Sequence, residues 1–365
     1  MKRFAICALA VLPLPVLSAG CADTGHILEI DYDAGRLVID DEWRSIRFDS
    51  SIDHERGILY VRDDEEPEGI MAFSLETGEW VRTYMVPTGD GPQELPGGIH
   101  GLSAASDGRL YVTGAQKVIE FGPQGQHLST WVPRVPPREG AVCELDGQPA
   151  VPALGGVVRR GDDGEDEAIG PVVTGDYDPD TWAQDGAIVE WQLWKSKIAC
   201  TPHAAFVVAE YGTDLVSSEY DEESDSVTVY YRASNRKGRL LIPEALAVGQ
   251  AATVGPYAAT DGRGNLVLVG VASVRLVGLW GGFKVTGAVV DPASGCHAVI
   301  RNPKSNLFER KFMGIYRDSA VVANEHYEDD GRGTVRFFNY AHQVGLYPLR
   351  RISGKPCTGM LPSVG

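Results

Sequence analysis

Apolar residues along this chain occur in short runs rich in Val, Ile, Tyr and Phe, and Gly, Asp, Asn and Pro separate these runs. Long segments with the period of an amphipathic helix are few. Short β-branched and aromatic runs bounded by turn residues are typical of antiparallel strands that tight turns connect. The 43 Gly and 22 Pro residues agree with many turns. The pattern therefore predicts an all-β protein with many strands.

One longer apolar stretch, from Asn265 to Phe283, has nearly the length of a membrane span. Arg275 lies in its middle and Gly interrupts it repeatedly, and a charged side chain is costly in the bilayer core. The stretch is instead predicted to form two buried strands, Leu266–Val271 and Val274–Trp280.

The order of strands and turns repeats along the chain. The segments Arg56–Tyr84 and Leu102–Trp131 both read as alternating strands and turns, and their equivalent residues Tyr60 and Tyr111 stand 51 residues apart. Weaker copies begin at Ala205, Asp261 and Ser319, and a degenerate copy fits around Leu154–Val158. Six such units predict a six-bladed β-propeller with four-stranded antiparallel blades, whose radial closure protects the sheet edges.

The two ends of the chain are expected to meet in one blade. Ile27–Ile39 precedes the first unit, and Thr334–Asn339 and Leu346–Ile352 follow the last one. Pairing of first and last segments removes two open sheet edges, so we predict it here.

The second unit resembles a known repeat. Gly89–Leu95, followed by Asp107-Gly108, Leu110–Val112, Val118-Ile119, Phe121 and Gly125, resembles the NHL repeat. The resemblance covers residues 86–131. Among proteins with this repeat, the segment is most similar to the six-bladed propeller lipoproteins of bacterial cell envelopes. The resemblance implies a six-bladed propeller at the cell envelope. It implies no activity, because propellers host many unrelated functions.

The first residues have the organisation of an export signal. Met1–Arg3 is basic, Phe4–Val16 is apolar, and small residues follow up to Cys21. Ser18–Cys21 resembles the lipobox of bacterial lipoproteins, which implies a leader over residues 1–20 and a lipidated Cys21. The six repeated units predict that residues 21–365 form a single propeller domain. The membrane would then be reached only through the lipid, on the periplasmic side or at the cell surface. Cleavage after Gly20 or Ala22 with simple secretion remains the alternative.

Four cysteines remain after Cys7 is assigned to the leader and Cys21 to the lipid: Cys143, Cys200, Cys296 and Cys357. An even number in an exported protein favours disulfides. Three connectivities exist, and the simplest joins Cys143 to Cys200 and Cys296 to Cys357.

The charge balance limits the partners. The chain has 365 residues, 50 acidic and 33 basic, with a net charge of −17, so nucleic-acid binding, which needs a basic surface, is not expected. Basic residues nevertheless occur in the links before four of the six inner strands: Arg44 and Arg47, Arg134 and Arg138, Lys195 and Lys197, and Arg310 and Lys311. Convergent cations at a channel mouth would bind an acidic glycan or a carboxylate-bearing envelope or extracellular protein. Ordinary solvated loop cations are the alternative.

Motifs of catalysis are lacking in the sequence: there is no GxSxG, HExxH, P-loop or complete GxGxxG. We therefore expect a binding or scaffolding module without a cofactor. Three further sites are possible, each with a structural alternative. Asp176–Asp180 has the carboxylates of a calcium site or is a solvated acidic loop. The tryptophans Trp182, Trp191 and Trp194 form a sugar-stacking platform or pack in the core. A metal in the central channel has candidate ligands at His203, Glu210, His326 and Asn324-Glu325, and polar loop residues are the alternative. Such a metal would make the chain a metal-dependent propeller hydrolase or lyase.

Overall fold

The structure is a computed structural model that describes residues 25–40, 46–63, 69–135, 137, 141–153, 156–169, 196–201, 204–209, 216–221, 226–231, 253–274, 283–291, 297–303, 310–329 and 335–354. All regular elements within these ranges are β-strands. Across the same ranges, no helix has the length and hydropathy needed to cross a bilayer.

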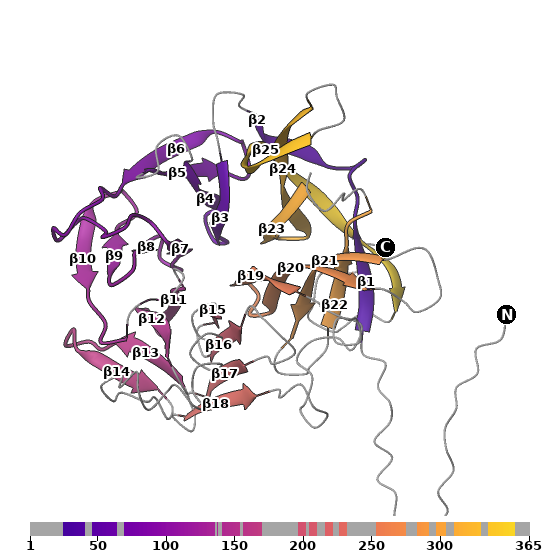
Figure 1. Cartoon of the computed structure of the whole chain (residues 1–365). Helices are drawn as coiled ribbons and strands as arrows, with labels where there is room; N and C mark the ends of the chain where they lie inside the picture. Colours follow the sequence, from indigo (N-terminus) through magenta and orange to yellow (C-terminus); the bar gives the residue numbers. More distant parts are fainter. Residues whose placement is uncertain are drawn as a thin grey trace, which may run out of the picture.

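The described strands form six groups around a common centre, so the chain is a six-bladed β-propeller (Figure 1). Blade 1 contains β3 (Ile46–Asp53), β4 (Ile58–Asp63), β5 (Gly69–Ser74) and β6 (Trp80–Met85), and blade 2 contains β7 (Gly101–Ala104), β8 (Leu110–Thr113), β9 (Val118–Phe121) and β10 (His127–Trp131). Blade 3 contains β11 (Cys143–Leu145), β12 (Gln148–Ala153), β13 (Gly156–Arg160) and β14 (Asp166–Ile169). These three blades confirm the repeat that the sequence predicts.

The second half of the chain forms the other blades. Blade 4 contains β15 (Ser196–Thr201), β16 (Ala204–Ala209), β17 (Val216–Asp221) and β18 (Ser226–Tyr231), where β15 pairs with β16 and β17 with β18. Blade 5 contains β19 (Thr253–Thr260), β20 (Leu266–Val274), β21 (Phe283–Val290) and β22 (His297–Arg301). Blade 6 contains β23 (Arg310–Tyr316), β24 (Ser319–Asp329) and β25 (Val335–Gly354), and β2 (Arg36–Asp40) is its outermost strand.

The ends of the described chain close the ring, as predicted. Strand β2 pairs antiparallel with β25, with Arg36 opposite Leu346. Strand β1 (Gly25–Ile30) lies between blades 5 and 6, parallel to β22 and antiparallel to the end of β25. Each pairing satisfies backbone groups that an open edge would leave exposed.

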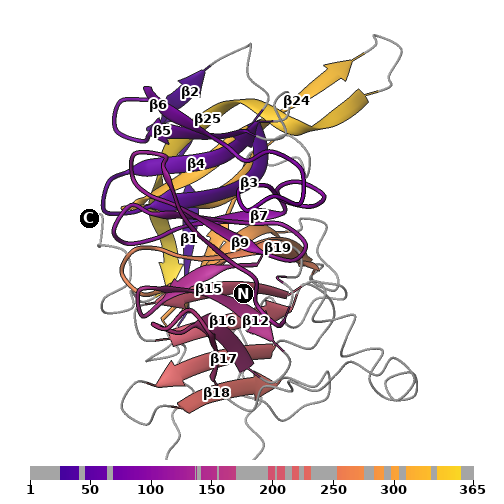
Figure 2. The same ribbon diagram turned by 90° about the vertical axis from the view of Figure 1, so that its left-hand side faces the viewer.

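Two strand assignments made from the sequence are wrong in detail. The last described segment is one strand, β25, where two separate pieces were expected. The end of β24 and the start of β25 pair with each other and project from the disc as a two-stranded arm (Figure 2). Strand β20 runs on to Val274, past the expected break after Val271, and a bulge in its pairing with β21 absorbs the irregularity. A bulge lets a twisted strand continue through a Gly-interrupted sequence.

The hydrophobic core lies between neighbouring blades, because the sheet of one blade packs face to face against the sheet of the next. Between blades 1 and 2, Ile70 packs with Leu110 and Ile119, and the Tyr84 and Phe121 rings meet edge to face at 5.7 Å. A similar cluster between blades 2 and 3 includes Tyr111, Val118, Val151 and Val158. This burial on both sides explains why the central strands read as continuous apolar runs.

A disulfide joins Cys143 of β11 to Cys200 of β15, with their Cα atoms 5.6 Å apart, and so connects blades 3 and 4. This is the first of the two expected pairs. Cys296 and Cys357 lie outside the described residues.

Candidate ligand-binding cavity

The centre of the propeller contains a cavity of about 420 Å³. The inner strand of every blade contributes to its wall: β3, β7, β11, β15, β19 and β23 (Figure 1). On each of β3, β7, β11 and β19, the wall extends past the last strand residue into the hairpin toward the second strand. The volume lies in the range of small-molecule sites.

The wall consists largely of small residues and strand edges. Gly101, Ser103 and Ala104 of β7, Ala199 of β15 and Gly314 of β23 are among the lining residues. The described residues that line the wall pair only on the outer sides of their inner strands, since β3 meets β25 only at Ile46 and Arg47, away from the wall. The backbone groups of the other strand edges face the centre. Some of these groups are satisfied from the next blade: the Ala104 N–H donates to the Ser51 hydroxyl at 2.9 Å.

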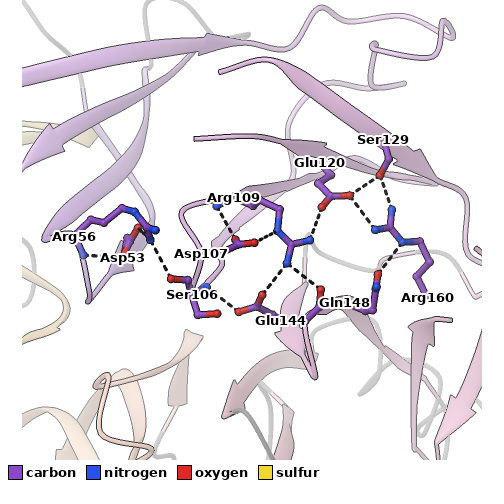
Figure 3. Close-up of polar contacts among 11 residues, drawn as sticks. Asp53, Arg56, Ser106, Asp107, Arg109, Glu120, Ser129, Glu144, Gln148 and Arg160 are labelled. Carbon is purple, nitrogen blue, oxygen red and sulfur yellow. Dashed lines mark hydrogen bonds and ion pairs between the residues drawn. The ribbon is translucent and has the colours of Figure 1, made fainter. Parts of the chain in front are cut away.

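A network of charged groups links the hairpins at one end of the cavity (Figure 3). In blade 1, the Asp53 carboxylate accepts the backbone N–H groups of Glu55 and Arg56 and pairs with the Arg56 guanidinium at 3.2 Å. Arg56 also donates to the Ser106 carbonyl of blade 2 at 3.0 Å. A side chain on Gly108 would lie 2.8 Å from that guanidinium and would displace it, and the positive φ of 86° at this turn independently favours glycine.

Blade 2 reaches blade 3 in the same way. Arg109 donates to Asp107 and to Glu120 at 2.5 Å each, to Glu144 at 3.1 Å and to the Gly147 carbonyl at 2.9 Å. Glu144 also accepts the Ser106 N–H at 2.7 Å. Burial opposes the charge of Arg109, but the hydrogen bond to Glu120 and the nearby carboxylates outweigh it and raise the pKa of Arg109.

Glu120 is the buried centre of this network. It accepts hydrogen bonds from Arg109, from Ser129 at 2.5 Å and from Arg160 at 2.9 Å, and Arg160 also bonds Ser129 and Gln148. Burial alone would raise the pKa of Glu120, but the hydrogen bonds from Ser129, Arg109 and Arg160 outweigh it and lower the pKa. The carboxylate is therefore held ionised between two arginines.

The His54 side chain connects blade 1 to blade 5. Its Nε2 donates to the Thr260 carbonyl of blade 5 at 2.8 Å, and both residues line the cavity. Burial lowers the pKa of His54 below its ordinary value, although the bond to Thr260 and the nearby Asp261 and Asp53 act in the opposite direction. The imidazole is therefore held neutral near pH 7.

The charged residues of the described cavity wall are all acidic: Asp53, Glu55, Glu144 and Asp146. Arg56 and Arg109 offset Asp53 and Glu144, and Arg159 pairs with Asp146 at 2.7 Å. The described wall contains no Lys or Arg. Its polar surface consists of hydroxyls, strand edges, two histidines and these carboxylates.

Of the six basic residues predicted to bind an anion in or before the inner strands of blades 3, 4 and 6, the structure describes the backbone of four and the side chains of two, Arg134 and Lys311. Arg134 follows β10, its side chain is 77% exposed, and its Nη2 lies 3.9 Å from Glu165. Inner strand β15 contains Lys197, and inner strand β23 contains Arg310 and Lys311. From the sequence, these residues were instead expected in the links that precede the strands. Lys311 is partly buried and is not among the residues that line the cavity. Arg138 and Lys195 lie outside the described residues, and the side chains of Lys197 and Arg310 are not described.

The remaining candidate sites fall mostly outside the described part of the chain. This holds for Cys21, Asp176–Asp180, the three Trp residues, His203 and Glu210. Asn324 donates to the Gln343 side chain at 3.0 Å. Among described residues, no group of three or more His, Cys, Asp or Glu side chains is arranged to hold a metal ion.

Sequence reasoning missed the hairpin arginines, although a repeat points to them. Asp107-Gly108-Arg109 of blade 2 recurs as Asp261-Gly262-Arg263 of blade 5. Both arginines reach the next blade, since Arg263 pairs with Asp318 of blade 6 at 2.6 Å. The repeated tripeptide is therefore the visible signal of a hairpin that fastens neighbouring blades.

Comparison with known proteins supports this architecture. No protein family and no curated protein sequence matches the chain. Among solved structures, the RRP9 WD40 repeats are similar, with a TM-score of 0.51 and 12% identity over 88% of this chain and 100% of that one. U3-55K (TM-score 0.47, 13% identity, 87% and 99% covered) and a protein of unknown function from Bacteroides caccae (0.42, 11%, 73% and 92%) are more distant. At such identity the first likeness supports the propeller fold alone.

Proposed function

We propose that this chain is a non-catalytic ligand-binding module of the bacterial cell envelope, exported and anchored through a lipid on Cys21. The observation that carries the binding role is the central cavity of about 420 Å³, to which all six inner strands contribute. Its wall of strand edges and hydroxyls fits a polar ligand, because such groups both donate and accept hydrogen bonds.

The location rests on two features of the sequence and one of the structure. The basic and apolar leader ends in Ser18–Cys21, which resembles a lipobox. The disulfide between Cys143 and Cys200 supports export, because such bonds persist in oxidising compartments. The NHL-like second unit agrees with a propeller lipoprotein.

The ligand that we propose is an acidic glycan. Its hydroxyls would bond the cavity wall, and its carboxylates would meet basic residues at the starts of inner strands and in the links before them, where Arg134 and Lys311 stand. Cations placed outside the cavity fit a chain that extends beyond the mouth better than a small anion enclosed within it.

Binding of polygalacturonate, with neutral dextran as the control polymer, tests the ligand. We expect salt-sensitive binding of polygalacturonate that Ser103→Trp abolishes by filling the cavity, and that the double variant Arg134→Ala with Lys311→Ala weakens about tenfold. Equal binding of both polymers, or binding that survives Ser103→Trp, would contradict the proposal.

Membrane fractionation tests the anchor separately. Cys21→Ser should release the protein from the membrane fraction, and Cys7→Ser in the leader should leave it bound. A Cys21→Ser variant that still sediments with membranes would show that no lipid on this residue is needed.

A further inference from the structure

One side chain joins two blades that are not neighbours. His54 belongs to the turn after β3 in blade 1, yet its Nε2 lies 2.8 Å from the Thr260 carbonyl at the end of β19 in blade 5. Blade 6 stands between these blades in the ring (Figure 1). The imidazole therefore reaches from blade 1 to blade 5 past the inner end of blade 6.

The surroundings of the imidazole fit it closely. A side chain on Gly262 would lie 2.7 Å from Cβ and Cγ of His54, so only glycine leaves room for the ring at this point of blade 5. The Tyr316 ring of blade 6 stacks beside it, with centroids 6.5 Å apart and an angle of 27°. Contacts from blades 5 and 6 thus hold a residue of blade 1 in one position.

The position of this contact relates it to one end of the cavity. His54, Thr260 and Gly262 all line the cavity, and all three lie at or beyond the ends of inner strands, where the hairpins are. The hairpins of neighbouring blades gather at this end, as the bonds from Arg56 to the Ser106 carbonyl and from Arg109 to the Gly147 carbonyl show. His100, the other histidine of the wall, precedes β7 and therefore lies toward the opposite end.

We propose that His54 is a stopper that closes the hairpin end of the cavity, so that ligands enter only from the opposite end, where the links between blades lie. The bond to Thr260 and the contact with Gly262 fasten the stopper across the opening. This makes His54 a residue that selects the side of entry. The inference goes beyond the proposed function and does not depend on the identity of the ligand.

Accessibility of a thiol beside the stopper tests this role without any ligand. Ala259→Cys places a thiol on the cavity wall next to Thr260. Its rate of modification is measured with a maleimide carried on dextran, which is too bulky to cross the cavity from the far end. The full-length parent protein without this thiol gives the background rate of its other cysteines.

In this background, His54→Ala should raise the modification rate at least tenfold, because the hairpin end is then open. His54→Gln keeps a donor for the Thr260 carbonyl and should retain a slow rate, and His100→Ala at the opposite end should change the rate less than twofold. Circular dichroism and the melting temperature confirm that each variant is folded.

A second variant distinguishes opening of the cavity from other local effects of removing the imidazole. Gly262→Ala displaces the ring without removing it, and it should also accelerate modification. Rates that stay unchanged in both His54→Ala and Gly262→Ala, or that rise equally in His100→Ala, would overturn the stopper. These rates are independent of polygalacturonate binding, so failure of either proposal can be distinguished from failure of the other.

Discussion

Replacement of Arg109 by Met is expected to weaken the joint between blades 2 and 3. The side chain of Arg109 is 17% exposed, and its guanidinium contacts Glu120, which is 6% exposed, and Glu144, which is 14% exposed. Met keeps most of the aliphatic length but removes every donor. Glu144 then loses its arginine, and Glu120 keeps Arg160 and the Ser129 hydroxyl. Two largely buried carboxylates therefore lose positive charge and hydrogen bonds that offset the cost of burying them.

The size of the effect follows from the cost of such a change. Removal of one partner from a buried ion pair destabilises a protein by about 3 to 5 kcal/mol. We take about 3 kcal/mol, because Arg160 still neutralises Glu120 in part. The entropy of unfolding of a chain of this size is about 0.7 kcal/mol per kelvin, so the melting temperature should fall by about 4 °C.

Urea unfolding and calorimetry under oxidising conditions measure this change. Arg159→Met is the matched control, because Arg159 also contacts two carboxylates, Asp146 and Glu167, but these are 59% and 47% exposed. Exposed pairs contribute at most about 1 kcal/mol. If Arg109→Met costs no more than Arg159→Met, then burial of the network does not set its strength, and the reasoning fails.

Three further results are expected. Loss of the Cys143–Cys200 disulfide, which spans 57 residues, should reduce stability by about 4 kcal/mol in the chain-entropy model, and equal urea midpoints with and without reductant would speak against this. Ile39→Asp, on the buried side of β2, should unfold blade 6 and promote aggregation seen by light scattering, whereas the exposed Leu37→Asp on the same strand should not. Because the pKa of Glu120 is lowered in the folded state, the stability from its ionisation is present above about pH 4.5 and is lost as the pH falls further. The Glu120→Gln variant should therefore lose less stability between pH 7 and pH 4 than the parent, and equal losses would exclude a role for this carboxylate.

Much of the fold can be predicted from the sequence because strands and turns are local features. The alternation around Tyr60 and Tyr111 and the glycines that follow give the first two blades with their strands in order. The pairing of the chain ends also follows, since an exposed edge is costly in any propeller. The two details that were wrong, the length of β25 and the break in β20, depend on bulges, which arise where a strand meets its partner.

The sequence by itself determined the repeat and the closure of the ring. It left three cysteine connectivities open, and the structure shows the pair Cys143–Cys200 that joins blades 3 and 4. Only the tertiary structure decided what stands at the centre. Thr260 follows His54 by 206 residues, and no local pattern relates the two. Arg134 and Lys311 belong to the basic residues that the sequence grouped by their place before inner strands, yet neither is among the residues of the described cavity wall, because a strand's start does not fix where its side chain points. A site built from six strand edges exists only after the ring closes, since each edge contributes a few atoms and closure alone brings them to one point.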